Sequence, residues 1–226
     1  MAKEKVFFER GKAAESDSKK KFRKILFGGE YGIYQKHLMN YLLSFVPKKS
    51  FGKVLDLGCA KGYLLSAFPE SARYGIDLDK KALNETKLKG NFKFASCTKI
   101  PFKANEFDLI LSSHLFEHLE EKELFDSMKE IQRTAKKDSY LIVILPNIEE
   151  LKWNFFNPWD HKTIITRERL KTLFEIHGFT PIKSFTYNRL FPNWFQFLFL
   201  KISPYLFFSF LRLFNKELVM IGKKSN

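Results

Sequence analysis

Two carboxylates and a glycine-rich turn are the features of this chain best suited to binding a ligand. Residues 54–63 (VLDLGCAKGY) are typical of a buried strand that carries Asp56 near its end and then turns into a helix. Glycine tolerates positive φ and lacks a Cβ, so backbone N–H groups in such a turn can approach a ligand closely. A second apolar run, residues 73–77, ends in Asp77 about 20 residues further on, where doubly wound nucleotide-binding folds place an acid on ribose hydroxyls. Together the two signals favour a nucleotide-type ligand over a tight turn that binds nothing.

The elements that would position these residues alternate between strand and helix, which argues for a parallel, doubly wound α/β sheet. Residues 140–145 form a continuous apolar run, typical of a parallel strand that is buried on both faces. Thr166 is the expected N-cap of a late helix, and Gly178 is its expected end. The apolar patterns predict strands at residues 53–57, 73–77, 92–95, 107–112, 140–145, 181–187 and 217–222, and helices at residues 34–46, 63–68, 80–88 and 124–135.

The motifs and their order resemble those of class I S-adenosylmethionine-dependent methyltransferases, a broad group that includes small-molecule and quinone methyltransferases. Residues 52–190 follow the family's order of motifs, and residues 217–223 are similar to its last strand. The resemblance implies a doubly wound, mostly parallel, seven-stranded Rossmann-like sheet whose last strand is antiparallel, with an N-terminal helical cap. It also implies S-adenosyl-L-methionine as the methyl donor. This chain has Ala60 where the family usually has glycine, so we expect a slightly less close approach of the backbone there.

The resemblance assigns most of the cofactor contacts to the carboxyl ends of the first two strands, the edge at which open parallel sheets bind ligands. Asp56 would lie near the ammonium group of the methionine part, Asp77 would accept hydrogen bonds from both ribose hydroxyls, and Leu78 would pack on the adenine. An alternative role for Asp77 is to cap the helix that follows it. The turn that would wrap the methionine part contains Gly58, Cys59, Ala60 and Gly62.

The loop after the third strand, residues 95–102, resembles the family loop that ends in Leu-Pro-Phe. The family often has an aspartate where this chain has Ser96, and that aspartate binds the adenine amino group. Ser96, or a backbone group of Cys97 or Thr98, would make this contact here. Ser113, at the end of the fourth strand, completes the expected cofactor contacts.

Two histidines are the candidate catalytic residues, in contact with the methyl acceptor. Residues 107–119 (FDLILSSHLFEHL) resemble the family signature Phe-Asp-x-Val…His-x-x-Glu-His-Leu, which places His114 at the carboxyl end of the fourth strand. Imidazole titrates near neutral pH, so His114 is a candidate general base; the alternative is that it orders the pocket by hydrogen bonding. His161, in an aromatic loop after the fifth strand, is the second candidate, with loop anchoring as its alternative role. His114 and His118 lie four residues apart, but no third ligand stands at matching spacing, so no metal site is expected.

Charge and composition limit the partners. The formal net charge of +14 either attracts a polyanion, nucleic acid or an anionic membrane face, or reflects lysines that only solvate the surface. Much of the excess basic charge gathers near the two ends of the chain, which fits contact with an anionic surface. Residues 112–115 (SSHL) lack the Asn/Asp-Pro-Pro-aromatic tetrapeptide of methyltransferases that act on amino groups of DNA bases, so nucleic acid is the less favoured partner. Two cysteines and no apolar segment after Met1 favour a cytoplasmic location.

A phenylalanine-rich segment, residues 191–214, calls for a partner of its own. It approaches the length of a membrane span, but Pro204 divides it, and Lys201 and Arg212 lie within it. The sixth and seventh strands flank the segment and would pair antiparallel, so a single membrane crossing would separate them. We therefore expect a hairpin of two short helices that emerges beside the site, admits a lipid-like acceptor and contacts the inner face of a membrane peripherally. A homodimer contact through the same helices is the alternative.

The length of 226 residues suits one domain. We expect a single methyltransferase domain over residues 1–226, with a helical cap at 1–50, a core at 51–190, the hydrophobic insertion at 191–215, and the last strand and tail at 216–226. The expected reaction is direct attack of an oxygen or carbon of a small, lipophilic acceptor on the sulfonium methyl group, driven mainly by proximity and orientation. The alternatives are an RNA methyltransferase and a cofactor-binding scaffold that has lost catalysis.

Overall fold

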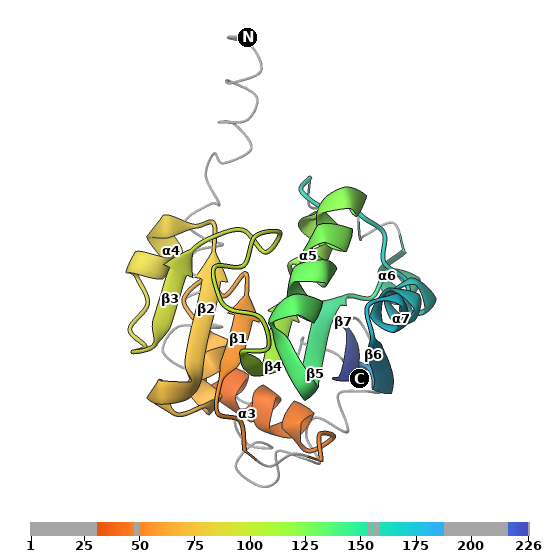
Figure 1. The fold of residues 1–226 in the computed structure, drawn as a ribbon. Helices are drawn as coiled ribbons and strands as arrows, with labels where there is room; N and C mark the ends of the chain where they lie inside the picture. Colours follow the sequence, from red (N-terminus) through yellow and green to blue (C-terminus); the bar gives the residue numbers. More distant parts are fainter. Residues whose placement is uncertain (1–30, 48–49, 153–154, 156–158, 188–216, 226) are drawn as a thin grey trace, which may run out of the picture.

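The computed structural model describes residues 31–47, 50–152, 155, 159–187 and 217–225. Among these residues seven strands form one sheet in the order β3-β2-β1-β4-β5-β7-β6 (Figure 1). The strands are β1 (Val54–Leu57), β2 (Arg73–Asp77), β3 (Asn91–Phe94), β4 (Phe107–Ser113), β5 (Ala135–Pro146), β6 (Phe179–Tyr187) and β7 (Glu217–Lys224). The helices are α3 (Tyr31–Leu43), α4 (Lys80–Asn84), α5 (Glu121–Thr134), α6 (Ile148–Leu151) and α7 (Arg167–Ile176), with 3-10 helices η1 (Tyr63–Ala67), η2 (Glu70–Ala72) and η3 (Phe116–His118). The predicted seven-stranded α/β sheet is confirmed.

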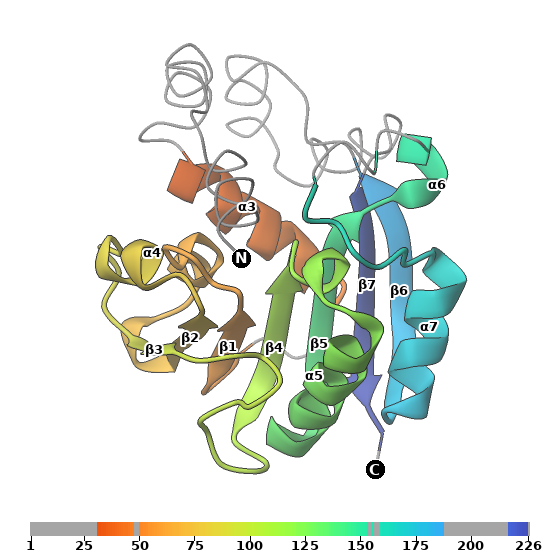
Figure 2. The same ribbon diagram turned by 90° about the horizontal axis from the view of Figure 1, so that it is seen from above.

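Strand β7 runs against its two neighbours. It pairs antiparallel with β5 and β6, whereas the pairs β1–β2, β1–β4, β2–β3 and β4–β5 are all parallel. The predicted antiparallel pairing of the last two strands is therefore confirmed (Figure 2). It follows that β1 to β6 end at one edge of the sheet, here called the carboxyl edge, and that β7 begins there. Because β6 is an edge strand, it accommodates Pro181, which cannot donate to a ladder hydrogen bond.

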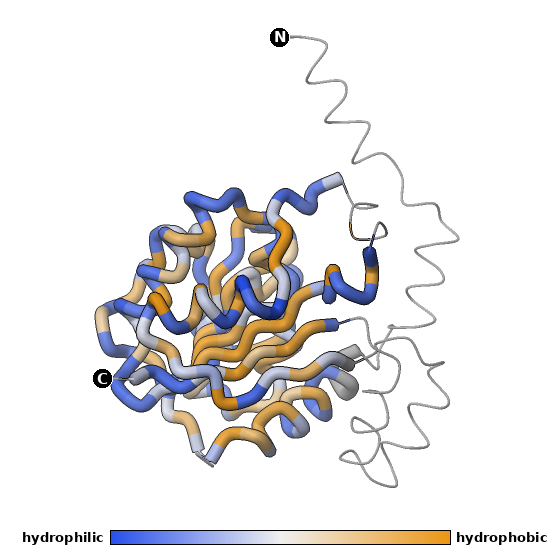
Figure 3. Tube along the Cα trace, turned by 90° about the vertical axis from the view of Figure 1, so that its right-hand side faces the viewer, coloured by the Kyte–Doolittle hydropathy of each residue, from blue (hydrophilic) through white to orange (hydrophobic). Residues whose placement is uncertain are grey.

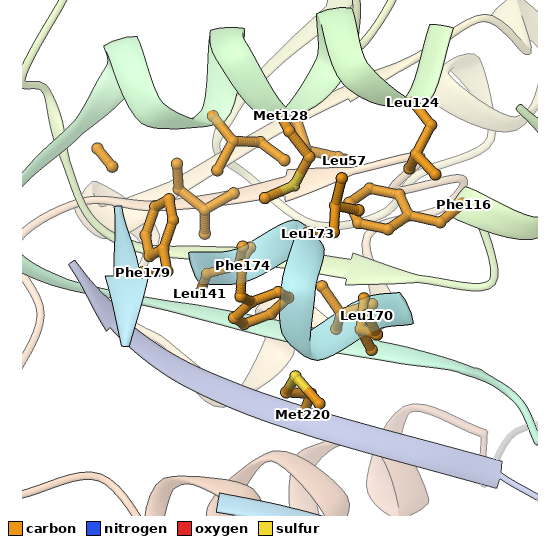
Figure 4. Packing of buried hydrophobic residues seen from close by; sticks show 14 of the residues in the cluster. Leu57, Phe116, Leu124, Met128, Leu141, Leu170, Leu173, Phe174, Phe179 and Met220 are labelled. Atoms are coloured by element: carbon orange, nitrogen blue, oxygen red, sulfur yellow. The ribbon is translucent and has the colours of Figure 1, made fainter. Parts of the chain in front are cut away.

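Successive apolar residues of the central strands belong alternately to two cores, one on each face of the sheet. Helices cover both faces (Figure 2), and the central strands are apolar throughout (Figure 3). In β5, Ile142 and Ile144 belong to the core that α3 and η1 cover, whereas Leu141 and Val143 belong to the core that α5 and α7 cover. Figure 4 shows the second core, in which Met128 of α5 and Leu173 and Phe174 of α7 lie over the strands. The central strands are therefore buried on both faces, as the continuous apolar run at residues 140–145 predicted.

Two expected helices differ from their predictions. Residues 63–67 form a 3-10 helix instead of an α-helix, and the helix predicted for residues 80–88 ends at Asn84. Two residues later the hydroxyl of Thr86 donates to the backbone oxygen of Lys61 at 2.7 Å and accepts from the Leu88 N–H at 3.3 Å. The second bond is a local side-chain bond of the kind that competes with helical backbone bonding. The prediction for α7 is confirmed, because Thr166 caps the helix by accepting from the Arg169 N–H and Gly178 follows its end with a φ of +76°.

Two expected features lie outside the described residues: residues 1–30 of the helical cap and the phenylalanine-rich insertion at residues 191–215. The helices that the structure does describe are all too short or too polar to cross a membrane.

Asp108 connects three segments at the amino edge of the sheet, opposite the carboxyl edge. Its Oδ2 accepts hydrogen bonds from the N–H groups of Gly52 and Lys53, at 3.1 and 2.9 Å, and from Nζ of Lys136 at 3.1 Å. The side chain belongs to β4 and is buried. One carboxylate therefore fixes the entry of β1 against both β4 and the start of β5.

We expect the substitution Asp108→Ala to lower the free energy of unfolding by about 2–4 kcal/mol, because it leaves two backbone N–H groups and an ammonium group without a buried charged acceptor. Urea unfolding followed by circular dichroism measures this. Asp126→Ala is the matched control, since Asp126 lies on the surface of α5 and pairs with Lys129 at 3.1 Å; we expect it to change stability by less than about 0.5 kcal/mol. Equal losses in the two variants would contradict the anchoring role of Asp108.

Candidate active site

The turn between β1 and η1 has the backbone geometry that its glycines predict. Gly58 and Gly62 have φ values of +67° and +75°, and Ala60 between them has a φ of +46°. Glycine adopts these left-handed values without steric cost, whereas alanine does not. Ala60 therefore keeps the glycine-like backbone path of the turn at a local cost in conformational energy.

This turn is hydrogen-bonded directly to the end of β2. The N–H groups of Gly58 and Cys59 both donate to the backbone oxygen of Ile76, at 2.9 and 3.0 Å. The next N–H along the chain, that of Ala60, donates to Oδ2 of Asp77 at 2.7 Å. The turn and the second carboxylate predicted to bind a ligand are therefore one connected structure.

Asp77 is available to a ligand and is not the cap of the following helix. The N-cap of α4 is Asp79, whose Oδ1 accepts from the Ala82 N–H at 3.0 Å. Oδ1 of Asp77 accepts only a local bond from the Asp79 N–H, at 2.7 Å. Since each carboxylate oxygen has two lone-pair sites, both oxygens of Asp77 can still accept a hydroxyl.

Asp56 is a buried carboxylate near the end of β1, with only 2% of its surface exposed. Burial, and secondarily the nearby charge of Asp77, raises the pKa of Asp56 well above its ordinary value. No hydrogen bond or cation from the described residues is among the causes of this shift, so none of them offsets the burial of the carboxylate. A positively charged group of a ligand would therefore relieve the cost of ionising this side chain.

An exposed apolar side chain and a short polar loop flank Asp77. Leu78 is 63% exposed although it directly follows a half-buried strand end, which suits contact with a flat, apolar ligand surface. In the loop after β3, Ser96 Oγ lies 2.8 Å from Thr98 Oγ1 and accepts from the Thr98 N–H at 3.2 Å. Cys97 is buried, and burial raises the pKa of its thiol, which disfavours the reactive thiolate.

The predicted cofactor residues are thus brought to a single edge. The Ala95 N–H donates to the backbone oxygen of Asp77 at 3.1 Å, which holds the loop after β3 beside the end of β2. Ser113 is the last, half-buried residue of β4, the strand that pairs with β1 on its other side. Their roles as cofactor contacts stay predictions, since only their positions are given by the fold.

His114 lies just beyond β4, between two carboxylates. Its Nδ1 is 3.2 Å from Oε1 of Glu117, and its Nε2 is 3.2 Å from Oε2 of Glu217. Its own N–H donates to the backbone oxygen of Ile144 at 2.9 Å, which continues the pairing of β4 with β5. The φ of +53° is strained for a residue other than glycine, and such strain is concentrated at functional positions.

Glu217 is a site residue that the sequence analysis missed. It is the first residue of β7 and pairs with Pro146 and Tyr187, the last residues of β5 and β6. The signal was present in the sequence, because an antiparallel last strand must begin at the carboxyl edge, and an acid at its first position therefore faces the site.

His161 packs against His118 and Phe155, with ring centroids 5.1 and 4.6 Å away. Its Nδ1 donates to the backbone oxygen of Phe155 at 2.6 Å, a bond of the loop-anchoring kind. Its Nε2 is left for a ligand, and a direct contact with the methyl acceptor stays a prediction.

Comparison with known proteins identifies the family. Residues 55–143 match a family described as "Methyltransferase domain". An uncharacterized protein of Methanocaldococcus jannaschii is 31% identical over 170 residues, which are 69% of this chain and 72% of that protein. The chain belongs to the S-adenosylmethionine-dependent methyltransferases. It uses S-adenosyl-L-methionine as its methyl donor.

Two further similarities agree with this family. A protein of Bartonella bacilliformis named "Ubiquinone biosynthesis O-methyltransferase" is 25% identical to this chain over 166 residues, which are 63% of this chain and 66% of that protein. The crystal structure of a SAM dependent methyltransferase from Archaeoglobus fulgidus superimposes with a TM-score of 0.66 at 22% identity, over 90% of this chain and 98% of that one. Because the identity to the Archaeoglobus fulgidus protein is only 22%, this similarity shows the shared fold alone.

The carboxyl edge of the methyltransferase fits this cofactor. The buried, uncompensated Asp56 matches the ammonium group of the methionine part, the open lone pairs of Asp77 match the ribose hydroxyls, and the exposed Leu78 matches the adenine ring. S-adenosylmethionine, when bound, supplies an electrophilic methyl group on its sulfonium. Asp56, Asp77 and Leu78 would hold that molecule at three separate points along one edge.

The raised pKa of Asp56 makes both stability and cofactor affinity depend on pH. Between its ordinary pKa of about 3.9 and its raised value, the folded protein binds a proton that the unfolded chain has lost. Stability without ligand should therefore fall as pH rises through this window, while affinity for the cofactor should rise, because the cofactor's ammonium group favours the ionised carboxylate.

We expect Asp56→Asn to stabilise the ligand-free protein at pH 7 by about 1–3 kcal/mol, to flatten the pH dependence of stability, and to weaken cofactor binding. Thermal unfolding at several pH values, with and without S-adenosylmethionine, measures all three effects. Asp126→Asn, an exposed substitution on α5, is the control. A variant that is less stable than the wild type at pH 7 and still binds the cofactor equally well would contradict this role.

Proposed function

We propose that this methyltransferase methylates an oxygen or carbon atom of a small, lipophilic acceptor that is bound at the carboxyl edge, beside His114. The observation that carries the proposal is the pair of contacts from His114 to Glu117 and Glu217, at 3.2 Å each, at the end of the central strand β4. These contacts fix a polar side chain at the point where the ends of β4 and β5 and the start of β7 meet.

The geometry favours an ordering role for His114 over that of a general base. Both ring nitrogens already face carboxylate oxygens, so neither one is directed at open space. A ring held in this way positions the carboxylates and the strand end around the acceptor. Catalysis then rests mainly on proximity and in-line orientation of the two reactants, which can supply most of the rate enhancement of a methyl transfer.

The proposal of a lipophilic acceptor is supported by where the chain leaves and rejoins the sheet. The described chain leaves β6 at Tyr187 and returns at Glu217, and these two residues pair with each other at the carboxyl edge. Glu217 in turn contacts His114. The residues between them, 188–216, include the phenylalanine-rich sequence, so the two described residues that flank this apolar segment lie at the carboxyl edge.

A similarity in sequence points the same way. The relative from Bartonella bacilliformis is named for ubiquinone biosynthesis, and its 25% identity extends over 63% of this chain. A quinone precursor is an aromatic ring with a hydroxyl group and an apolar tail, which is one example of the acceptor class proposed here. We also propose a cytoplasmic protein that binds the membrane surface peripherally, since the net charge of +14 attracts anionic lipid headgroups.

Isothermal titration with S-adenosylmethionine and with S-adenosylhomocysteine tests the cofactor site. We expect Asp77→Asn to weaken both ligands about tenfold to hundredfold, because charge-assisted hydrogen bonds to hydroxyls contribute about 1.5–3 kcal/mol. Asp79→Asn is the matched control, since asparagine also caps helices and Asp79 caps α4. Absence of heat with the wild type, or equal weakening by both variants, would contradict the assigned role of Asp77.

Methyl-labelled S-adenosylmethionine tests the acceptor class. The wild-type protein is incubated with a lipid extract, a water-soluble metabolite extract and total RNA, and the label is followed into each fraction, with the Asp77→Asn variant as control. We expect label in the organic phase of the lipid reaction. Label in RNA would favour the RNA methyltransferase alternative, and cofactor binding with no product in any fraction would favour the non-catalytic scaffold.

A further inference from the structure

Three side chains that can ligate a metal converge next to His114. Glu117 and His118 come from the 3-10 helix η3, and His161 comes from the loop that precedes α7. Each offers one ligand atom, and these atoms all lie within 4.8 Å of one another. The sequence-based expectation of no metal rested on the lack of a third ligand. The fold supplies one, because His161 lies beside His118 although it is distant in the sequence.

Both imidazoles are held in the form that a metal requires. Nδ1 of His118 lies 3.0 Å from the backbone oxygen of Asp160, and Nδ1 of His161 lies 2.6 Å from the backbone oxygen of Phe155. A carbonyl oxygen can only accept, so each Nδ1 carries the proton and each Nε2 has a free lone pair. Metal-binding histidines usually donate their other N–H to a backbone carbonyl or a carboxylate in this way.

Glu117 supplies the anionic ligand, and its environment calls for a cation. The residue is 1% exposed. Its Oε1 lies 3.2 Å from Nδ1 of His114, while Oε2 has no hydrogen-bond partner among the described residues. A buried carboxylate oxygen without a partner is costly, and such atoms in folded proteins usually mark a bound ion or water.

The two segments are fixed to each other by backbone hydrogen bonds. The N–H groups of Lys162 and Thr163 both donate to the backbone oxygen of Glu117, at 2.7 and 3.2 Å, and the Thr163 hydroxyl donates to that of Leu119. These hydrogen bonds hold the loop that carries His161 against the 3-10 helix that carries Glu117 and His118. A site built in this way loses little entropy when an ion binds.

We propose that Glu117, His118 and His161 bind a divalent first-row transition-metal ion, with Zn²⁺ the preferred occupant. Two imidazole nitrogens and one carboxylate suit Zn²⁺, whereas Mg²⁺ and Ca²⁺ prefer oxygen ligands alone. Three protein ligands leave a fourth coordination position open to a water molecule or an oxygen of a small molecule. The proposal does not depend on methyl transfer, since the site is argued from ligands that the cofactor residues do not include.

Titration with Co²⁺ as a spectroscopic substitute tests the site. The full-length wild-type chain is freed of metal with a chelator and titrated with Co²⁺ in the absence of S-adenosylmethionine. We expect the visible absorption of a four- or five-coordinate Co²⁺ ion, saturating at one equivalent and abolished by one equivalent of Zn²⁺. No saturable band, or saturation without competition by Zn²⁺, would overturn the proposal.

Matched variants locate the ion. His161→Ala and Glu117→Gln should each weaken Co²⁺ binding about 100-fold or more, since even outer partners of metal ligands contribute about 10- to 100-fold. His37→Ala removes a histidine of α3 that is outside the cluster and should leave binding unchanged. Thermal unfolding of the metal-free proteins verifies folding, and Zn²⁺ should raise the melting temperature of the wild type and of His37→Ala only. Equal effects of His37→Ala and His161→Ala would overturn the site, while cofactor titration of the same samples reports separately on the proposed methyltransferase function.

Discussion

The hydrogen bonds between the turn after β1 and the end of β2 are the constraint on which the active site depends. Three successive N–H groups, those of Gly58, Cys59 and Ala60, are all used on β2, two on the Ile76 oxygen and one on the Asp77 carboxylate. Three consecutive hydrogen bonds to one strand end leave the turn little freedom once the sheet has formed. The parallel register that sets Leu57 beside Ile76 therefore also sets the position of the turn that is predicted to bind the cofactor.

The same edge gathers acidic groups away from water in a chain of net charge +14. Asp56, Glu117 and Glu217 are all buried there. Among the described contacts, Glu117 and Glu217 both lie 3.2 Å from the ring of His114. A site with this charge distribution suits ligands that carry positive charge, as the sulfonium and ammonium groups of S-adenosylmethionine do. The basic surface attracts anions instead, so the acidic edge and the basic surface favour ligands of opposite charge.

The sequence predicted the sheet well, because its signals are local. A strand such as residues 140–145 is recognised from its own apolar run, and Asp56 and Asp77 are recognised because each follows such a run. Local signals also failed where a contact with another segment intervened: the Thr86 hydroxyl donates to the backbone oxygen of Lys61, and the helix predicted through residue 88 ends at Asn84. The spacing of apolar residues in the sequence does not reveal a hydrogen bond of this kind between two segments.

Residues that meet only through the fold were harder to find. Glu217 is about a hundred positions from His114 in the sequence, and its contact follows only from the antiparallel entry of β7. Likewise, the position of His161 depends on backbone hydrogen bonds from Lys162 and Thr163 to Glu117, which no spacing in the sequence reveals. The motifs thus predicted the residues of the cofactor side, and only the fold brought Glu217 and His161 to the edge where the acceptor is expected.

The direction of β7 has an evolutionary consequence. Since β6 ends and β7 starts at neighbouring positions, the stretch between them can lengthen, shorten or change composition without shifting the register of any strand. The residues predicted to bind the methyl donor lie at the ends of β1 to β4, and β5 separates these strands from β7 and β6. Under the proposed function, selection can therefore remodel what is methylated while leaving the donor half untouched. Grafting this stretch from one relative to another would then exchange the substrate preference.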